Sequence, residues 1–237
     1  MKTSNKILLG LIIFIFSFIL IFMVFARITV FSAPDLQAFG EIQIKEFPLE
    51  KIVSLKTSGA ISWNVTIIPD SQCRMEIEAP EQFHKFIKTE TSGRHVKLDF
   101  HSNNELIPMA TVRLYTPGFE RAEIEGKTTL EFDNFNLQYL KIKGEGYLTV
   151  NGKNNRINNF DLELGGMASI NLSENQIKDV HIEQNGFGKT QIGMVDGKIA
   201  GEIAGMITLE YAGNLQKIEV EKIGWARVKE LKNNEKL

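Results

Sequence analysis

Apolar and polar residues alternate along most of the chain after residue 40. Clear examples are residues 41–47 (EIQIKEF) and residues 51–67 (KIVSLKTSGAISWNVTI). Successive side chains of a β-strand point to opposite faces, so this period of two predicts strands with one buried face. Residues 80–90 (PEQFHKFIKTE) have helical spacing of Phe83, Phe86 and Ile87, which predicts one or two helical turns. The pattern therefore predicts an all-β fold.

From about residue 120, glycines interrupt the alternation at a nearly constant interval. Six of them follow an apolar–polar–apolar run, with spacings of 18, 21, 21, 19 and 19 residues: Gly126, Gly144, Gly165, Gly186, Gly205 and Gly224. A period near 20 with short strands is typical of a solenoid, in which each coil of chain stacks on the coil before it. The leucine frame of a leucine-rich repeat is absent. We therefore predict a single-stranded parallel β-helix over residues 41–231.

In such a fold, inward-facing apolar residues one period apart form ladders. We predict two ladders, one of Ile124, Ile142, Leu162, Ile182 and Ile203, and one of Leu148, Ile170, Ile192, Leu209 and Val228. The glycines are expected at sharp turns, often with positive φ. Trp63 is expected in the core. Trp225 is expected to cover the open end of the solenoid, or otherwise to mark a contact surface. A twisted antiparallel sandwich with glycine turns is the alternative fold.

The first 27 residues have a different character. Lys2 and Lys6 precede 20 uncharged residues (7–26), and Arg27 follows them. As a helix, 20 residues extend about 30 Å, the thickness of a bilayer's hydrocarbon core. We predict a cytoplasmic N-terminus and an uncleaved transmembrane anchor in residues 1–27, although cleavage after Ala26 stays open. A stalk (28–40), the β-solenoid ectodomain (41–231) and a polar tail (232–237) follow, all outside the cytoplasm, in the periplasm or extracellular.

Composition and charge exclude some partners. Removing Lys2, Lys6 and Arg27 from the 27 basic residues leaves 24 against 29 acidic residues, so the predicted ectodomain is mildly acidic. This balance does not indicate a nucleic-acid partner. The single cysteine, Cys73, cannot form an intramolecular disulfide, which argues against a small disulfide-rich secreted fold.

Two short motifs resemble nucleotide-binding loops but do not match them. Residues 186–190 (GFGKT) have Glu183 where a phosphate-binding loop requires its first glycine, and QIGMV after Thr190 predicts a strand in place of the required helix. Residues 144–149 (GEGYLT) have Thr149 in place of the third glycine of a dinucleotide fingerprint. Both segments are interpreted as turns of the repeat, and no nucleotide or other cofactor is expected.

Candidate metal and catalytic residues are sparse. The histidines His84, His95, His101 and His181 lack metal-ligand spacing, so no metal site is predicted. Residues one period apart become neighbours in stacked coils, so Glu125, Lys143 and Glu163 could form a ladder of charges. Some β-helix enzymes use clustered carboxylates to cleave acidic polysaccharides. We interpret this ladder as surface charge that protects the sheet, and we predict no catalytic residue.

The order of features resembles the head-GIN domain family of auto-transporter adhesins, a domain of unknown function. The resemblance covers residues 45–231: an opening segment (FPLEKIVSLKTSGAISWNVTIIPD), a middle one (TVRLYTPGFERAEIEG), and glycine repeats that here read EGKT, GEGY, GGMA, NGFG, AGMI and IGWA. It implies a right-handed β-helix at the cell envelope and brings no catalytic residues. A transporter barrel would need many alternating strands of about 10 residues, and no such segment is present.

Three functions follow in order of preference. The first is a non-enzymatic, membrane-anchored β-solenoid that presents a binding or adhesion surface, with an envelope protein or a polysaccharide as its partner. The second is a structural scaffold whose solenoids stack end to end, as in bactofilin-like proteins. The polar sequence at the C-terminus (KELKNNEKL) argues against such stacking. The third is a polysaccharide-active β-helix enzyme, which the absence of a catalytic constellation makes the least favoured.

Overall fold

The computed structural model describes residues 16, 18, 40–102 and 109–231, and the chain divides into two compact units, Met1–Ala38 and Phe39–Leu237. In the first unit only Phe16 and Phe18 are described, and both are helical and exposed. The predicted membrane anchor otherwise lies outside the described residues, as do nearly all of the stalk and the tail after Leu231. Within the described residues, no helix has the length and hydrophobicity to cross a membrane.

The second unit is built from β-strands, which confirms the prediction of an all-β chain. One short helix interrupts them, α2 (Glu81–His84), where the sequence predicted helical turns. The strands are β1 (Ile42–Pro48), β2 (Ser54–Gly59), β3 (Ser62–Pro69), β4 (Arg74–Pro80), β5 (Ile87–Ser92), β6 (His95–Phe100), β7 (Met109–Thr116), β8 (Arg121–Asp133), β9 (Asn136–Gly224) and β10 (Arg227–Glu230).

The N-terminal end of this unit is a mixed sheet. Strands β1 to β8 follow the order β1-β4-β7-β3-β8-β2-β6-β5, and three pairs are antiparallel: β1 with β4, β4 with β7, and β5 with β6. The parallel pairing predicted for residues 41–231 does not extend to these pairs. Strands β5 and β6 are joined by a tight turn at Gly93, with φ +58°, and such a short connection permits only antiparallel pairing.

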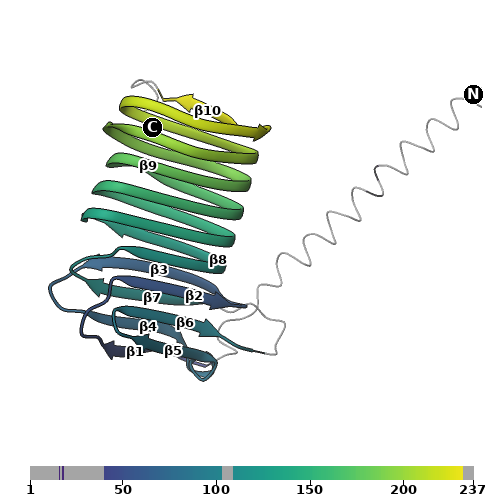
Figure 1. The fold of residues 1–237 in the computed structure, drawn as a ribbon. Coiled ribbons are helices and arrows are strands. Elements are labelled where there is room, and N and C mark those ends of the chain that lie inside the picture. The colour runs from purple at the N-terminus through teal and green to yellow at the C-terminus, as the bar shows by residue number, and fades with distance from the viewer. Residues whose placement is uncertain (1–15, 17, 19–39, 103–108, 232–237) are drawn as a thin grey trace, which may run out of the picture. The chain divides into compact units, whose positions relative to one another are not determined.

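From β8 onward, the chain pairs with itself in parallel, one period apart. Residues Arg121–Asp133 of β8 pair with residues 20 positions later in β9, and β10 pairs with β9 at an offset of 19. Figure 1 shows β9 as a stack of coils, with β1 to β7 at one end and β10 at the other. Paired strands lie about 4.8 Å apart, so each coil adds that height to the stack.

One glycine of each coil lies where the backbone bends with positive φ. These corner glycines are Gly126, Gly146, Gly166, Gly186, Gly205 and Gly224. A Cβ atom on Gly146 would lie 2.5 Å from the Gly126 carbonyl oxygen, and one on Gly166 would lie 2.6 Å from the Gly146 oxygen. Gly144 and Gly165 were predicted at corners, but neither has positive φ, so these two predictions are wrong. The corners of these coils lie at Gly146 and Gly166 instead.

The predicted inward-facing residues are buried. All five members of the first ladder are at most 1% exposed, and in the second ladder only Val228, in the last strand, is half-buried. The predicted pairing within the first ladder is shifted by two residues, however. Ile142 pairs with Ala122, and Ile124 pairs with Gly144. Trp63 is fully buried, as predicted, and its Nε1 donates to the Ser58 carbonyl over 3.2 Å.

A second corner of the coils is held by buried asparagines. Asn155 Oδ1 accepts from the Phe135 backbone N–H over 2.8 Å, and its Nδ2 donates to the Phe132 carbonyl over 2.9 Å. One coil later, Asn175 Oδ1 accepts from Asn155 Nδ2 over 2.8 Å. The two asparagine side chains therefore form hydrogen bonds with backbone groups of the turn in place of a neighbouring strand.

Candidate binding face

A row of large apolar side chains lies on the outside of the coils. The residue after each of the last five corner glycines is aromatic or methionine, and all five are between 42% and 76% exposed. This apolar ladder consists of Tyr147, Met167, Phe187, Met206 and Trp225. Exposed apolar residues scattered singly are ordinary, but a contiguous row marks an interaction site.

The backbone fixes the alignment of the apolar ladder. Tyr147 pairs with Lys127 of β8, one residue after the paired Gly126 and Gly146. Because each corner glycine packs against the carbonyl of the glycine before it, the residue after it occupies an equivalent position on every coil. Trp225 is 76% exposed, so the prediction that it covers the end of the stack is wrong. Its alternative interpretation, a contact surface, agrees with this exposure.

Two polar columns run beside the apolar ladder. The nearer one, the hydroxyl column, holds four hydroxyl groups and two cations. Thr129 pairs with Thr149, Ser169 and Lys189 follow at the same interval, and Thr208 pairs with Arg227. The farther column begins with the pair Glu131 and Asn151 and continues with Asn171, Gln191 and Glu210 at the same interval. A shallow groove runs between the ladder and the hydroxyl column, lined by Tyr147, Met167, Phe187, Thr149 and Ser169 among others.

The segment GFGKT contributes to this face. Lys189 Nζ lies 2.9 Å from Glu210 Oε2, and Gln191 Nε2 donates to the same carboxylate oxygen over 2.9 Å. Thr190 is fully buried, and its Oγ1 donates to Gln184 Oε1 over 2.8 Å. The residues after Thr190 continue β9 as a strand, in agreement with the interpretation of this segment as part of the repeat.

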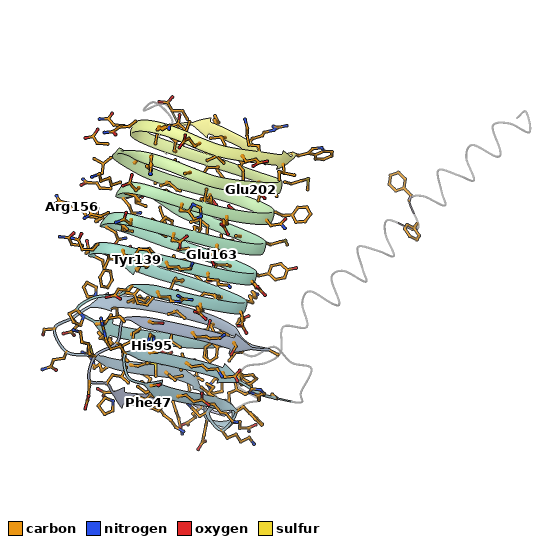
Figure 2. All side chains as sticks on the ribbon, in the orientation of Figure 1. Phe47, His95, Tyr139, Arg156, Glu163 and Glu202 are labelled. Atoms are coloured by element: carbon orange, nitrogen blue, oxygen red, sulfur yellow. The ribbon has the colours of Figure 1, made fainter. Side chains whose placement is uncertain are left out.

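A different side of the coils carries stacked acidic residues. Glu163, Glu183, Glu202 and Glu221 line a shallow groove together with Lys143, and Figure 2 labels Glu163 and Glu202. The predicted ladder of Glu125, Lys143 and Glu163 is partly wrong. Lys143 pairs with Glu123, whereas Glu125 pairs with Glu145. The two-residue shift leaves each side chain facing outward but places it in a neighbouring column.

At the edge of this acidic side, Lys141 is held by two carboxylates. Its Nζ lies 3.0 Å from Asp161 Oδ2 and also binds Glu163 Oε1. The hydrogen bond to Glu163 raises the pKa of Lys141 above its usual 10.5, and the bond to Asp161 raises it further, against the opposing effect of burial. Tyr139 donates its hydroxyl to the same Asp161 oxygen over 3.2 Å.

Lys141→Gln is expected to lower the free energy of unfolding, and more at pH 8 than at about pH 11.5. The folded-state pKa is raised, so the contribution of Lys141 is fully present below pH 10.5 and is lost as the pH rises through the folded-state value. Urea unfolding of the full chain at both pH values measures the difference. Lys143→Gln, at an exposed lysine two residues later, is the control. An equal effect of Lys141→Gln at the two pH values would contradict the assignment.

The histidines do not converge. His84 is buried, with Nε2 3.0 Å from the Gln43 carbonyl oxygen. His101 Nδ1 lies 3.2 Å from Asp99, and His181 Nε2 lies 3.2 Å from Glu183. No group of three or more His, Cys, Asp or Glu side chains suited to a metal occurs among residues 40–102 and 109–231. The apolar ladder is therefore the feature of these residues that most clearly indicates a binding site.

The stacked coils (Figure 1) and the apolar ladder define an all-β protein with an exposed row of apolar side chains. The family model described as "Putative auto-transporter adhesin, head GIN domain" matches residues 54–214, well over half of the chain, so the chain belongs to the head GIN domain family. This confirms the resemblance seen in the sequence. The match includes the apolar ladder except Trp225. No protein of curated function matches the sequence.

Several solved structures match the chain at low sequence identity. A "putative adhesin" from Bacteroides fragilis has 12% identity and a TM-score of 0.64, covering 81% of this chain and 97% of that one. A "putative lipid binding protein" and a "putative adhesin" from Parabacteroides distasonis each have 14% identity, with TM-scores of 0.45 and 0.42, and each match covers 81% of this chain and 98% of the other. The match to the Bacteroides fragilis structure shows the fold alone.

Proposed function

We propose that this protein is a non-enzymatic, single-pass membrane protein of the cell envelope that binds a partner through its apolar ladder. Residues 7–26 form the anchor, and residues 28–237 lie in the periplasm or outside the cell. The coils constitute a right-handed β-helix that presents the ladder on its outer surface. The apolar ladder carries the proposal, because its five large apolar side chains stand in one row and each is between 42% and 76% exposed.

Photocrosslinking in intact cells tests this proposal. The photoreactive residue benzoylphenylalanine is placed at Phe187 in the apolar ladder, or at Tyr139, an exposed tyrosine outside it. Irradiation is expected to produce adducts from position 187 at several times the yield from position 139, because only the ladder is in contact with a partner. Equal yields at the two positions, or none at either, would contradict the proposal. Adducts are measured by electrophoretic shift and mass spectrometry.

End-to-end assembly remains a second candidate because the last coil leaves inward-facing residues partly exposed. Ile218 is 40% exposed, whereas Ile199, 19 residues earlier, is fully buried. A second copy stacked on this end would bury Ile218 as Ile199 is buried. A third photoreactive position at Ile218 separates the two functions. Adducts between copies from position 218, without adducts from position 187, would favour the scaffold over the binding protein.

A further inference from the structure

We infer that the ligand of the apolar ladder is an extended, uncharged polysaccharide with β-1,4-type linkage, lying along the ladder and across the strands. The inference rests on the proposed function, because it assigns a ligand to the same face. It is drawn from three properties of that face: the spacing of its aromatic side chains, the chemistry of the columns beside them, and the absence of net charge at its centre.

The aromatic side chains recur at every second coil. Tyr147, Phe187 and Trp225 are separated by 40 and 38 residues, which correspond to two coils in each case, and Met167 and Met206 lie between them. Two strand spacings amount to about 9.6 Å. In an extended β-1,4-linked glycan, alternate sugars turn over, and the disaccharide repeat is close to this distance. The three aromatic rings can therefore face equivalent sugars of one chain.

The columns match the two kinds of surface that a sugar ring presents. The C–H bonds on the face of a pyranose form an apolar surface, which a flat aromatic side chain covers well. The two methionines are flexible and polarizable, so they fill the irregular space between successive rings. Hydroxyl groups project from the edges of the sugars. Thr149 and Ser169 stand in the column next to the ladder, and Asn151 stands in the column after that. Their side chains can donate hydrogen bonds to those hydroxyls and accept hydrogen bonds from them.

The centre of this face carries no net charge. Thr149, Ser169, Asn151 and Asn171 are all uncharged, and Lys189 beside Phe187 is paired with Glu210 over 2.9 Å. The exposed cations Lys127 and Arg227 lie at the two ends of the face. An acidic polysaccharide would be matched by a row of cations along the whole ladder, whereas Lys127 and Arg227 stand only at its two ends. A protein partner would be matched by a compact patch with a polar rim, whereas this ladder is one residue wide and about four strand spacings, or 19 Å, long. A linear neutral ligand fits that shape.

Binding of defined oligosaccharides to the full-length chain in lipid nanodiscs tests the inference. The probes are cellohexaose and N-acetylchitohexaose, which are neutral and β-1,4-linked, against maltohexaose, which is α-linked, and hexagalacturonate, which is acidic. Isothermal titration calorimetry is expected to show that at least one of the first pair binds about tenfold or more tightly than both of the others. Equal binding of all four, or tightest binding of hexagalacturonate or maltohexaose, would overturn the inference.

Two tyrosines provide matched variants. Tyr147→Ala, in the apolar ladder, is expected to weaken binding of the preferred oligosaccharide about tenfold, as removal of a central aromatic contact does in other interfaces. Tyr139→Ala, outside the ladder, should change the affinity less than about twofold. Both side chains are exposed, so both variants should keep the wild-type circular dichroism spectrum. An unchanged affinity in Tyr147→Ala would contradict binding along the ladder.

The outcomes also separate this inference from the proposed function. If none of the four oligosaccharides binds, while position 187 still forms adducts with a protein or with a second copy of the chain in cells, the polysaccharide inference is wrong and the proposed binding face stands. If no oligosaccharide binds and position 187 forms no adducts above those of position 139, both are wrong.

Discussion

Gly186→Ala is expected to lower the free energy of unfolding by about 3–5 kcal/mol, because it introduces both backbone strain and a clash. Gly186 has φ +125°, a conformation that L-residues rarely adopt, and an added Cβ would lie 2.1 Å from the Gly166 carbonyl oxygen. Neither backbone can move away, since each is paired with the coil on its other side. Urea unfolding of the full chain, followed by the fluorescence of the buried Trp63, measures the loss.

Gly165→Ala is the matched control for this prediction. Gly165 has no positive φ, and the nearest atom to an added Cβ is Glu145 Cγ at 3.9 Å. The substitution should leave stability unchanged or raise it by up to about 1 kcal/mol, because alanine restricts the unfolded chain more than glycine does. If Gly165→Ala proved as harmful as Gly186→Ala, the assignment of the corner to Gly146, Gly166 and Gly186 would be wrong.

Asn155→Ala is expected to lower the free energy of unfolding by about 3 kcal/mol, at about 1 kcal/mol for each of three lost hydrogen bonds. The fully buried Asn155 side chain bonds the Phe135 N–H, the Phe132 carbonyl and Asn175 Oδ1. Alanine leaves the Phe135 N–H inside the turn without this acceptor, at a position where the Asn155 side chain is 0% exposed. Thermal unfolding monitored by circular dichroism measures the effect.

The control is Asn158→Ala, three residues along the same coil. Asn158 is exposed, and its Nδ2 donates to the Gln138 side chain over 2.6 Å. Because water replaces that bond, the expected loss is about 0.5 kcal/mol or less. Comparable losses in the two variants would show that the buried asparagine column does not hold the corner together.

The register established by these corners also determines the alignment of the apolar ladder. Only the pairing of Gly126 with Gly146, and of each later corner glycine with the one before it, brings Tyr147, Met167 and Phe187 into one row. A corner at Gly144 or Gly165 would have aligned other side chains. A signal for the ladder was nevertheless present in the sequence, because each of the five corner glycines from Gly146 to Gly224 precedes an aromatic residue or methionine. The recurrence of asparagine at positions 155 and 175, one period apart, was a similar signal for the second corner.

The sequence by itself determined the strands, the approximate period and the buried side chains. Apolar residues at every second position must face the core whichever strands they pair with, so the burial of Ile142, Leu162 and Ile182 followed from alternation alone. The recurrence of glycine near every 20 residues indicated stacked coils, and the order of features identified the head GIN domain family.

Only the tertiary structure decided the register, because a shift of two residues preserves every inward and outward side chain. Alternation therefore cannot distinguish Ile124 from Ala122 as the partner of Ile142. The choice depends on where the backbone can bend with positive φ and let one carbonyl approach the next coil, which is a property of two coils together. The antiparallel pairs of β1 to β7 and the exposure of Trp225 were likewise decided by how distant segments pack together, which alternation along the chain does not specify.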